Sequence, residues 1–180
     1  MIPLVVAATE AELRGADGIP RITCGIGPVE AAASTASAVL NLRPSLVLHV
    51  GIAGCRRGCG LEPGRIVIGS ESIYCDTDSP LVISRLEPDA RLLAAAREAL
   101  PDAAVMPIGT SARVGGTHGC DVEAMEGFAV LRAAVRAALP ALEVRAVANE
   151  IEEADRARWR FDDALAALAE AVPKLVAAFE

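Results

Sequence analysis

Short apolar runs alternate along this chain with longer alanine-rich or amphipathic stretches. The apolar and β-branched runs predict strands at 3–8, 21–24, 45–50, 65–70, 104–108, 111–114 and 143–148. The longer stretches predict helices at 31–42, 87–100, 122–139 and 159–179, with Pro28 near the first turn of the first and Pro173 bending the last. Strands that alternate with helices favour a three-layer α/β/α fold with a central, mostly parallel mixed sheet, and 180 residues fit a single domain, 1–180.

Small residues stand at two predicted strand ends. Gly51–Gly54 follows the strand at 45–50, and we interpret it as a tight turn whose backbone is able to meet a ligand. Gly25 and Gly27 precede the first helix, where free backbone N–H groups favour an anion or a sugar. Glu30 occupies the place of the third glycine in a dinucleotide-binding fingerprint, so a dinucleotide cofactor is not expected.

Carboxylates flank these turns. Glu123 and Glu126 stand three apart at the start of the predicted helix 122–139, which predicts that they share a helix face. Acidic residues in a first turn often serve only the helix dipole, so the pattern alone leaves both interpretations open. Glu12 follows the first strand, at the edge where open α/β sheets bind ligands, although a solvated loop carboxylate has the same pattern.

The composition of the chain argues against several classes of function. The net charge of −7 argues against nucleic acid, and neither a basic amphipathic face nor an apolar run of spanning length indicates a membrane. The first residues lack a basic leader, so we expect a cytoplasmic protein whose five cysteines are reduced. Cys55 and Cys59 form the only close cysteine pair, and with two histidines in the chain a metal site is not expected.

Three segments in this order resemble the purine nucleoside phosphorylase and nucleosidase family. Residues 25–32 resemble its first glycine turn, 50–54 its second, and 122–126 its ribose-binding signature. Within the family the likeness is greatest to the futalosine hydrolases of the menaquinone pathway, on residues 123–129, 143–150 and 155–162. The resemblance implies the nucleoside phosphorylase-like fold in a shortened form, and cleavage of a nucleoside without metal or cofactor.

The resemblance assigns roles that suit the side chains concerned. Glu126 matches the glutamate that binds the ribose hydroxyls, and Met125 is expected to pack beneath the sugar. Glu12 matches the general base that activates water. Without the resemblance, Met125 would be interpreted as ordinary core and Glu12 as a loop carboxylate.

Asn149 occupies the position where adenine-cleaving relatives have an aspartic acid. An amide accepts from a protonated ring nitrogen and donates to a 6-oxo group, so the resemblance predicts a hypoxanthine-type base. An Asx-turn is the structural alternative. Phosphorylases of the family have an arginine and a serine where this chain has His49 and Ile52, which favours water over phosphate as the nucleophile.

The remaining expectations concern contacts and alternatives. The expected substrate contacts are Ile52, Ala53, Gly54, Val114, Gly116 and Thr117, and a substrate carboxylate could pair with Arg113, Arg158 or Arg160. Relatives carry longer segments after Glu12 and before Glu123, and a homo-oligomer is expected. A phosphorylase, a methylthioadenosine/S-adenosylhomocysteine-type nucleosidase and a non-catalytic nucleoside-binding protein remain as alternatives.

Overall fold

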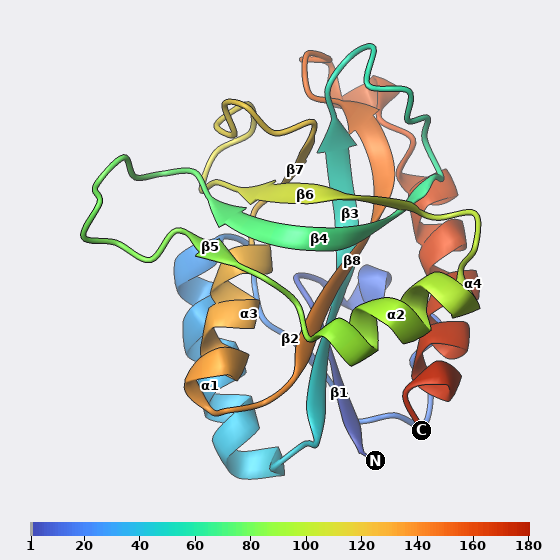
Figure 1. Cartoon of the computed structure of the whole chain (residues 1–180). Helices are drawn as coiled ribbons and strands as arrows, with labels where there is room; N and C mark the ends of the chain where they lie inside the picture. Colours follow the sequence, from blue (N-terminus) through green and yellow to red (C-terminus); the bar gives the residue numbers. More distant parts are fainter. Residues whose placement is uncertain (1) are drawn as a thin grey trace.

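The fold is a mixed sheet covered by helices on both faces (Figure 1). The computed structural model describes residues 2–180. The strands are β1 (Pro3–Ala7), β2 (Arg21–Thr23), β3 (Leu46–Cys55), β4 (Ile66–Tyr74), β5 (Arg85–Leu86), β6 (Ala104–Thr110), β7 (Val122–Ala124) and β8 (Ala141–Glu150). The helices are α1 (Pro28–Leu42), α2 (Ala90–Ala99), α3 (Gly127–Arg136) and α4 (Phe161–Ala178), with short 3₁₀ turns η1 (Glu10–Leu13) and η2 (Arg156–Arg158).

The sheet is mostly parallel and part of it closes on itself. Strands follow the order β2-β1-β3-β7-β6-β4-β5, and β8 pairs with both β3 and β4. The strands β3, β7, β6, β4 and β8 therefore form a ring, in which β3–β7 and β4–β8 are antiparallel. Each of the five contributes to a small apolar cluster: Ala53, Cys55, Val67, Ile108, Val122, Ala124 and Val147. The predicted mixed, mostly parallel sheet is confirmed, and its closure into a ring is a feature that the sequence did not reveal.

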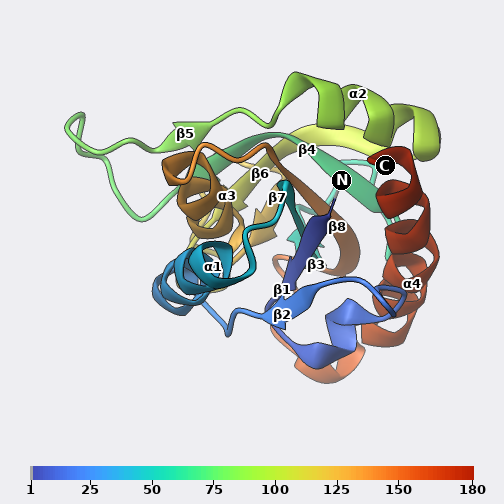
Figure 2. The same cartoon turned by 90° about the horizontal axis from the view of Figure 1, so that it is seen from below.

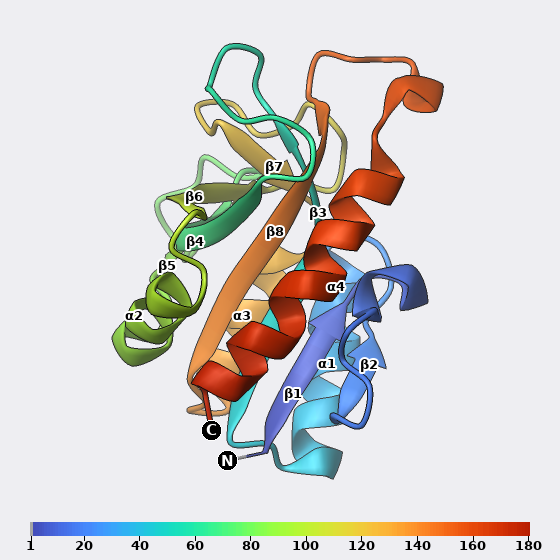
Figure 3. The same ribbon diagram turned by 90° about the vertical axis from the view of Figure 1, so that its right-hand side faces the viewer.

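Two helical layers bury the faces of the sheet (Figures 2 and 3). Helices α1 and α3 pack on one face through Ala31, Val39, Val130 and Leu131. Helices α2 and α4 pack on the other through Leu92, Leu168, Val172 and Leu175. Pro28 begins α1 as predicted, and α4 continues through Pro173. None of the helices formed by residues 2–180 has the length and apolar character needed to cross a membrane.

Strand β3 is longer than predicted and corrects the interpretation of Gly51–Gly54 as a turn. The strand continues to Cys55, pairing with β8 throughout and shifting register between Ala53 and Gly54. Both glycines are needed for space, because a Cβ on Gly51 would collide with the Arg145 guanidinium and one on Gly54 would lie 3.1 Å from the amide of Asn149. Small residues here let side chains of β8 cross over β3.

The predicted helix at 122–139 is wrong at its start. Val122–Ala124 form β7, which pairs with β3 and β6, and α3 begins only at Gly127. Val122 and Ala124 point into the ring, and sheet pairing outweighs the helical pattern of the sequence. Glu123 and Glu126 therefore do not share a helix face.

The ends of other strands and helices also differ from those predicted. Strand β6 runs through Gly109 to Thr110, and 111–114 form no strand, because the pairing with β4 and β7 continues to Thr110. Helix α2 begins after Asp89, whose carboxylate caps it by accepting from the backbone of Arg91 and Leu92. Strand β8 extends to Glu150, beyond the predicted end at 148, so Asn149 lies on a strand.

Candidate active site

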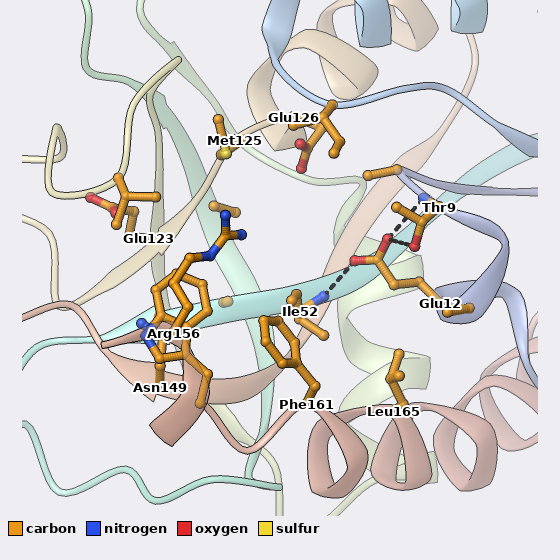
Figure 4. A pocket seen from close by; sticks show the side chains of 18 residues that line it. Thr9, Glu12, Ile52, Glu123, Met125, Glu126, Asn149, Arg156, Phe161 and Leu165 are labelled. Carbon is orange, nitrogen blue, oxygen red and sulfur yellow. Dashed lines mark hydrogen bonds between the residues drawn. The ribbon is translucent and has the colours of Figure 1, made fainter. Parts of the chain in front are cut away.

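A cavity of about 310 Å³ opens where the carboxyl ends of β1, β3 and β8 meet. This is the usual ligand edge of a parallel sheet, and the volume lies within the range of small-molecule sites. Side chains from seven separate chain segments line it, and Figure 4 shows them around the cavity. They include Thr9, Glu12, Ile26, Ile52, Val114, Glu123, Met125, Glu126, Asn149, Arg156, Trp159, Phe161 and Leu165.

Glu12 is held rigidly at the inner end of this cavity. The backbone N–H and hydroxyl of Thr9 donate to its Oε2 at 2.9 and 2.7 Å, and the backbone N–H of Ile52 donates to Oε1 at 2.9 Å. The residue is only 5% exposed. Three of the roughly four acceptor positions of a carboxylate are thus occupied, which leaves about one to accept from a bound water or hydroxyl.

Glu126 is the second buried carboxylate. Its Oε1 accepts from the backbone N–H of Gly27 at 3.1 Å, which ties it to the glycine turn before α1, and its Oε2 lies 3.5 Å from Nη2 of Arg145. Burial raises the pKa of Glu126 above its ordinary 4.5, while Arg145 and the Gly27 N–H oppose that rise. Glu12 and Glu126 thus converge on the cavity from η1 and from the start of α3.

Arg145 is the buried cation between them, and its side chain has no solvent exposure. In the β3–β8 register Arg145 stands opposite Gly51, so the guanidinium passes over β3 and Nη1 reaches the carbonyl of Ile52 at 3.4 Å. Burial disfavours its charge, but the carboxylates of Glu143, Glu126 and Glu12 outweigh that and raise the pKa of Arg145. The cation offsets the charge of the neighbouring carboxylates.

Two further side chains complete the surroundings of Arg145. Glu143 accepts from Arg145 Nε at 2.8 Å and from the Ser72 hydroxyl at 2.9 Å. His49 Nε2 is in hydrogen-bond contact with Arg145 Nη2. Arg145, Glu143 and His49 are buried behind the cavity wall and do not line it.

The middle of the cavity offers apolar contacts and one amide. Met125, Ile52, Ala53 and Gly54 line it, and Asn149 projects into it from the end of β8. One N–H of the Asn149 amide donates to the carbonyl of Glu150 at 2.9 Å. Its other N–H and its oxygen remain for a ligand, one donor and one acceptor side by side.

The outer wall is aromatic with a cation at its edge. The rings of Trp159 and Phe161 lie 5.5 Å apart between centroids, and Leu165 continues the wall along α4. The Arg156 guanidinium lies over the Trp159 ring at 5.0 Å from the centroid. Arg156 forms no ion pair within residues 2–180, so its charge faces this mouth unpaired.

Two residues expected to contact substrate do not line the cavity. Thr117 is buried and donates to Glu123 Oε2 through its backbone at 3.1 Å and its hydroxyl at 2.8 Å. Gly116 packs against Ser111, where no Cβ would fit. Glu123 also accepts from Gly115 N–H at 2.6 Å, so this carboxylate holds the 115–117 loop in place. The loop contributes Val114 alone to the cavity.

Sequence reasoning missed Arg145, Arg156 and the aromatic wall. Arg158 and Arg160, expected near a substrate carboxylate, pair instead with Glu153 at 3.1 Å and with Asp163. Arg113 is exposed and lies outside the cavity lining. A signal for Arg145 did exist: Glu143 and Arg145 stand two apart in an apolar strand, and alternate residues of a strand share a face.

Cysteine and metal chemistry find little support at this site. Burial, and next the negative charge of Glu126, raises the pKa of the Cys24 thiol to about 12, so it stays protonated at neutral pH. Within residues 2–180, no three His, Cys, Asp or Glu side chains gather as a metal site would require. The carboxylates of Glu12 and Glu126 and the amide of Asn149, which all line the cavity, remain the candidates for the chemistry.

Comparison with known proteins agrees with this geometry. Residues 18–179 match the Phosphorylase superfamily. The futalosine hydrolase of Streptomyces coelicolor is 37% identical over 196 residues, covering 91% of this chain and 81% of that protein.

Solved structures share the fold. The methylthioadenosine/S-adenosylhomocysteine nucleosidase of Colwellia psychrerythraea, in complex with adenine, superposes with a TM-score of 0.87 at 19% identity, covering 98% of this chain and 94% of the other. The futalosine hydrolase of Helicobacter pylori gives 0.87 at 15% identity and 97% of both chains. The chain therefore belongs to the phosphorylase superfamily and, within it, to the family that includes the Streptomyces coelicolor futalosine hydrolase.

Proposed function

We propose that this N-glycosyl hydrolase cleaves a 6-oxopurine nucleoside, futalosine, into hypoxanthine and dehypoxanthine futalosine, a step of menaquinone biosynthesis. The observation that carries the proposal is the convergence of Glu12, Glu126 and Asn149 on one cavity. The 37% identity to a futalosine hydrolase supports the choice of substrate.

The proposed reaction follows from the two carboxylates. Cleavage of the glycosidic bond passes through an oxocarbenium-like ribose, on which positive charge develops. Glu126 accepts hydrogen bonds from the ribose hydroxyls and offsets that charge, with Met125 packed beneath the ring. Glu12 uses its remaining acceptor position to hold a water and takes its proton as the water attacks the anomeric carbon.

Water suits this cavity better than phosphate. Ile52 lines the cavity where phosphorylases carry a serine, and His49 is fully buried behind Arg145. The nearby Arg56 donates to the carbonyls of Thr117 and Cys120, which occupies its guanidinium. Phosphate binding needs cationic and hydroxyl groups, and this end of the cavity has neither to spare among the described residues.

Asn149 is proposed to select the base, and Asn149→Asp tests this. A carboxylic acid suits a 6-aminopurine, whereas the amide accepts from a ring N–H and donates to a 6-oxo group. We expect the ratio of kcat/KM for futalosine to that for its 6-amino analogue to fall by about 10- to 100-fold, since a mismatched buried polar contact costs about 1–3 kcal/mol. Asn41→Asp, at the chain's exposed second asparagine, is the control and should leave the ratio unchanged. An unchanged ratio in Asn149→Asp would remove Asn149 from base recognition.

The pH profile should show the ionisation of Glu126. Its ribose contact requires the carboxylate, and burial raises its pKa above 4.5. Activity is therefore present above the raised pKa and lost as the pH falls through it. We expect the acidic limb of kcat/KM to have its midpoint above 4.5, and the limb to change in the residual activity of Glu126→Gln, where this carboxylate is absent. Steady-state rates measured from about pH 4 to about pH 8 provide the measurement.

The mouth of the cavity supports an extended 5′ group. The aromatic wall of Trp159 and Phe161 suits an apolar extension, and the unpaired Arg156 suits a carboxylate at its end. The experiment is a comparison of kcat/KM for futalosine and 5′-methylthioadenosine. A preference for futalosine supports the proposal, and a preference for methylthioadenosine assigns the chain the alternative substrate.

Assembly and location complete the proposal. We expect a homo-oligomer in the cytoplasm, with the five cysteines reduced. The loop between β4 and β5 presents Leu81, which is 93% exposed, next to exposed Val82 and Ile83. Contiguous exposed apolar residues of this kind mark interaction surfaces. Light scattering on the purified chain measures the assembly.

A further inference from the structure

His49 is a fully buried polar residue that the proposed reaction does not use. It lies on β3 and has no solvent exposure. Its Nδ1 is 2.9 Å from the carbonyl oxygen of Val6 on β1, and its Nε2 contacts Nη2 of Arg145 on β8. A single ring thus connects three adjacent strands beneath the cavity.

The two partners of His49 fix its tautomer. The Val6 carbonyl only accepts, so Nδ1 carries the proton, and the guanidinium of Arg145 only donates, so Nε2 is bare. Burial, and next the positive charge of Arg145, hold the pKa of His49 well below its ordinary value. The ring is therefore neutral and offers Arg145 a fixed acceptor.

The guanidinium is consequently held from two sides. Nε donates to Glu143, which Ser72 orients in turn, and Nη2 donates to His49. With these two bonds fixed, the second N–H of Nη2 faces Glu126 and Nη1 faces the carbonyl of Ile52. Gly51 leaves the space that this orientation requires.

We propose that His49 is a positioning residue, whose Nε2 orients Arg145 so that Nη2 faces Glu126 and Nη1 faces the carbonyl of Ile52, the residue whose N–H donates to Glu12. The inference deepens the proposed function and rests on it. His49, although buried and outside the cavity lining, would thereby help to position the carboxylates of Glu12 and Glu126. A displaced guanidinium would change the placement of Glu126 in the transition state more than it would change substrate binding.

A matched pair of variants separates this role from a structural one. The amide of His49→Gln reaches about as far as Nε2 and keeps an acceptor for Arg145, whereas the amide of His49→Asn reaches about as far as Nδ1 and keeps only the donor to Val6. We expect His49→Asn to lower kcat by about 10- to 100-fold with little change in KM, and His49→Gln to retain most of kcat. Equal losses in both, or a greater loss in His49→Gln, would overturn the proposal.

Nitrogen NMR of the histidine ring in the wild-type chain tests the contact without turnover. The expected spectrum shows a protonated Nδ1 and a bare Nε2 at neutral pH, with the Nε2 signal shifted in Arg145→Met. An Nε2–H tautomer or an imidazolium would overturn the inference. If the expected tautomer is found and the wild type cleaves no nucleoside, the His49–Arg145 contact stands and the proposed function fails.

Discussion

Glu12→Gln is expected to lower kcat by about 10²–10⁴-fold, the range that a general base contributes. The amide has the size of the carboxylate but cannot accept the proton that water must lose. Thr9 and Ile52 present three donors to this side chain, so the amide oxygen can satisfy Thr9 or Ile52 but not both. Nucleoside binding should persist, because Glu126, Met125 and Asn149 are untouched.

The control lies in the same 3₁₀ turn. Glu10 is exposed and does not line the cavity, so Glu10→Gln should retain wild-type kcat. Single-turnover rates and equilibrium binding of the nucleoside separate chemistry from affinity. Wild-type turnover by Glu12→Gln would exclude Glu12 from the mechanism.

Arg145→Met is expected to have the largest effect on stability. Removing the cation leaves Glu143 and Glu126 buried with no compensating charge, and breaking a buried pair in this way costs about 3–5 kcal/mol. For a chain of this length the loss corresponds to a fall in Tm of roughly 6–20 °C. kcat should fall as well, because Glu126 loses the cation that favours its ionised form.

A second substitution distinguishes charge from packing. Adding Glu143→Gln to Arg145→Met removes one of the two uncompensated carboxylates and should recover part of the lost unfolding free energy. Arg91→Met is the control, because the Arg91 side chain is 88% exposed and its contact with Asp89 contributes little. Thermal and urea unfolding measure the differences. A Tm of Arg145→Met within the spread of the Arg91→Met control would contradict the account of the buried cation.

The sequence revealed the layers of the fold but not how the strands meet. Runs such as 3–8 and 45–50 are strongly apolar, and burial on both faces produces that pattern in any parallel sheet. Val122–Ala124 was predicted as helix because it precedes an alanine-rich helix, yet its neighbours in space are β3 and β6, far away in the sequence. Pairing of this kind depends on tertiary context, which a local pattern does not contain.

The candidate site was likewise predicted only in part from the sequence. Met125, Glu126 and Asn149 belong to segments that resemble a known family, and Glu12 matches the family's general base by its position in the chain. The structure places all four around one cavity. Their roles remain predictions. Gly116 and Thr117 were also expected there, but Gly116 packs against Ser111 and Thr117 donates to Glu123.

Arg145 and the aromatic wall depend on geometry that spacing does not encode. Arg145 reaches the site because Gly51 lies opposite it across β3, a register visible only once the strands pair. Trp159 was predicted as the first residue of a helix that in fact begins at Phe161. Trp159 therefore lies just before α4, where its ring lines the cavity and contacts the Arg156 guanidinium.

Release of hypoxanthine from futalosine and from inosine, each with and without phosphate, tests the central claim most directly. We predict that hypoxanthine is released from futalosine whether or not phosphate is present, and that little is released from inosine. Release that requires phosphate would contradict the argument from Ile52 and His49. The absence of release from either nucleoside, by a folded chain, would contradict the assignment of Glu12, Glu126 and Asn149 and favour a nucleoside-binding protein without catalysis.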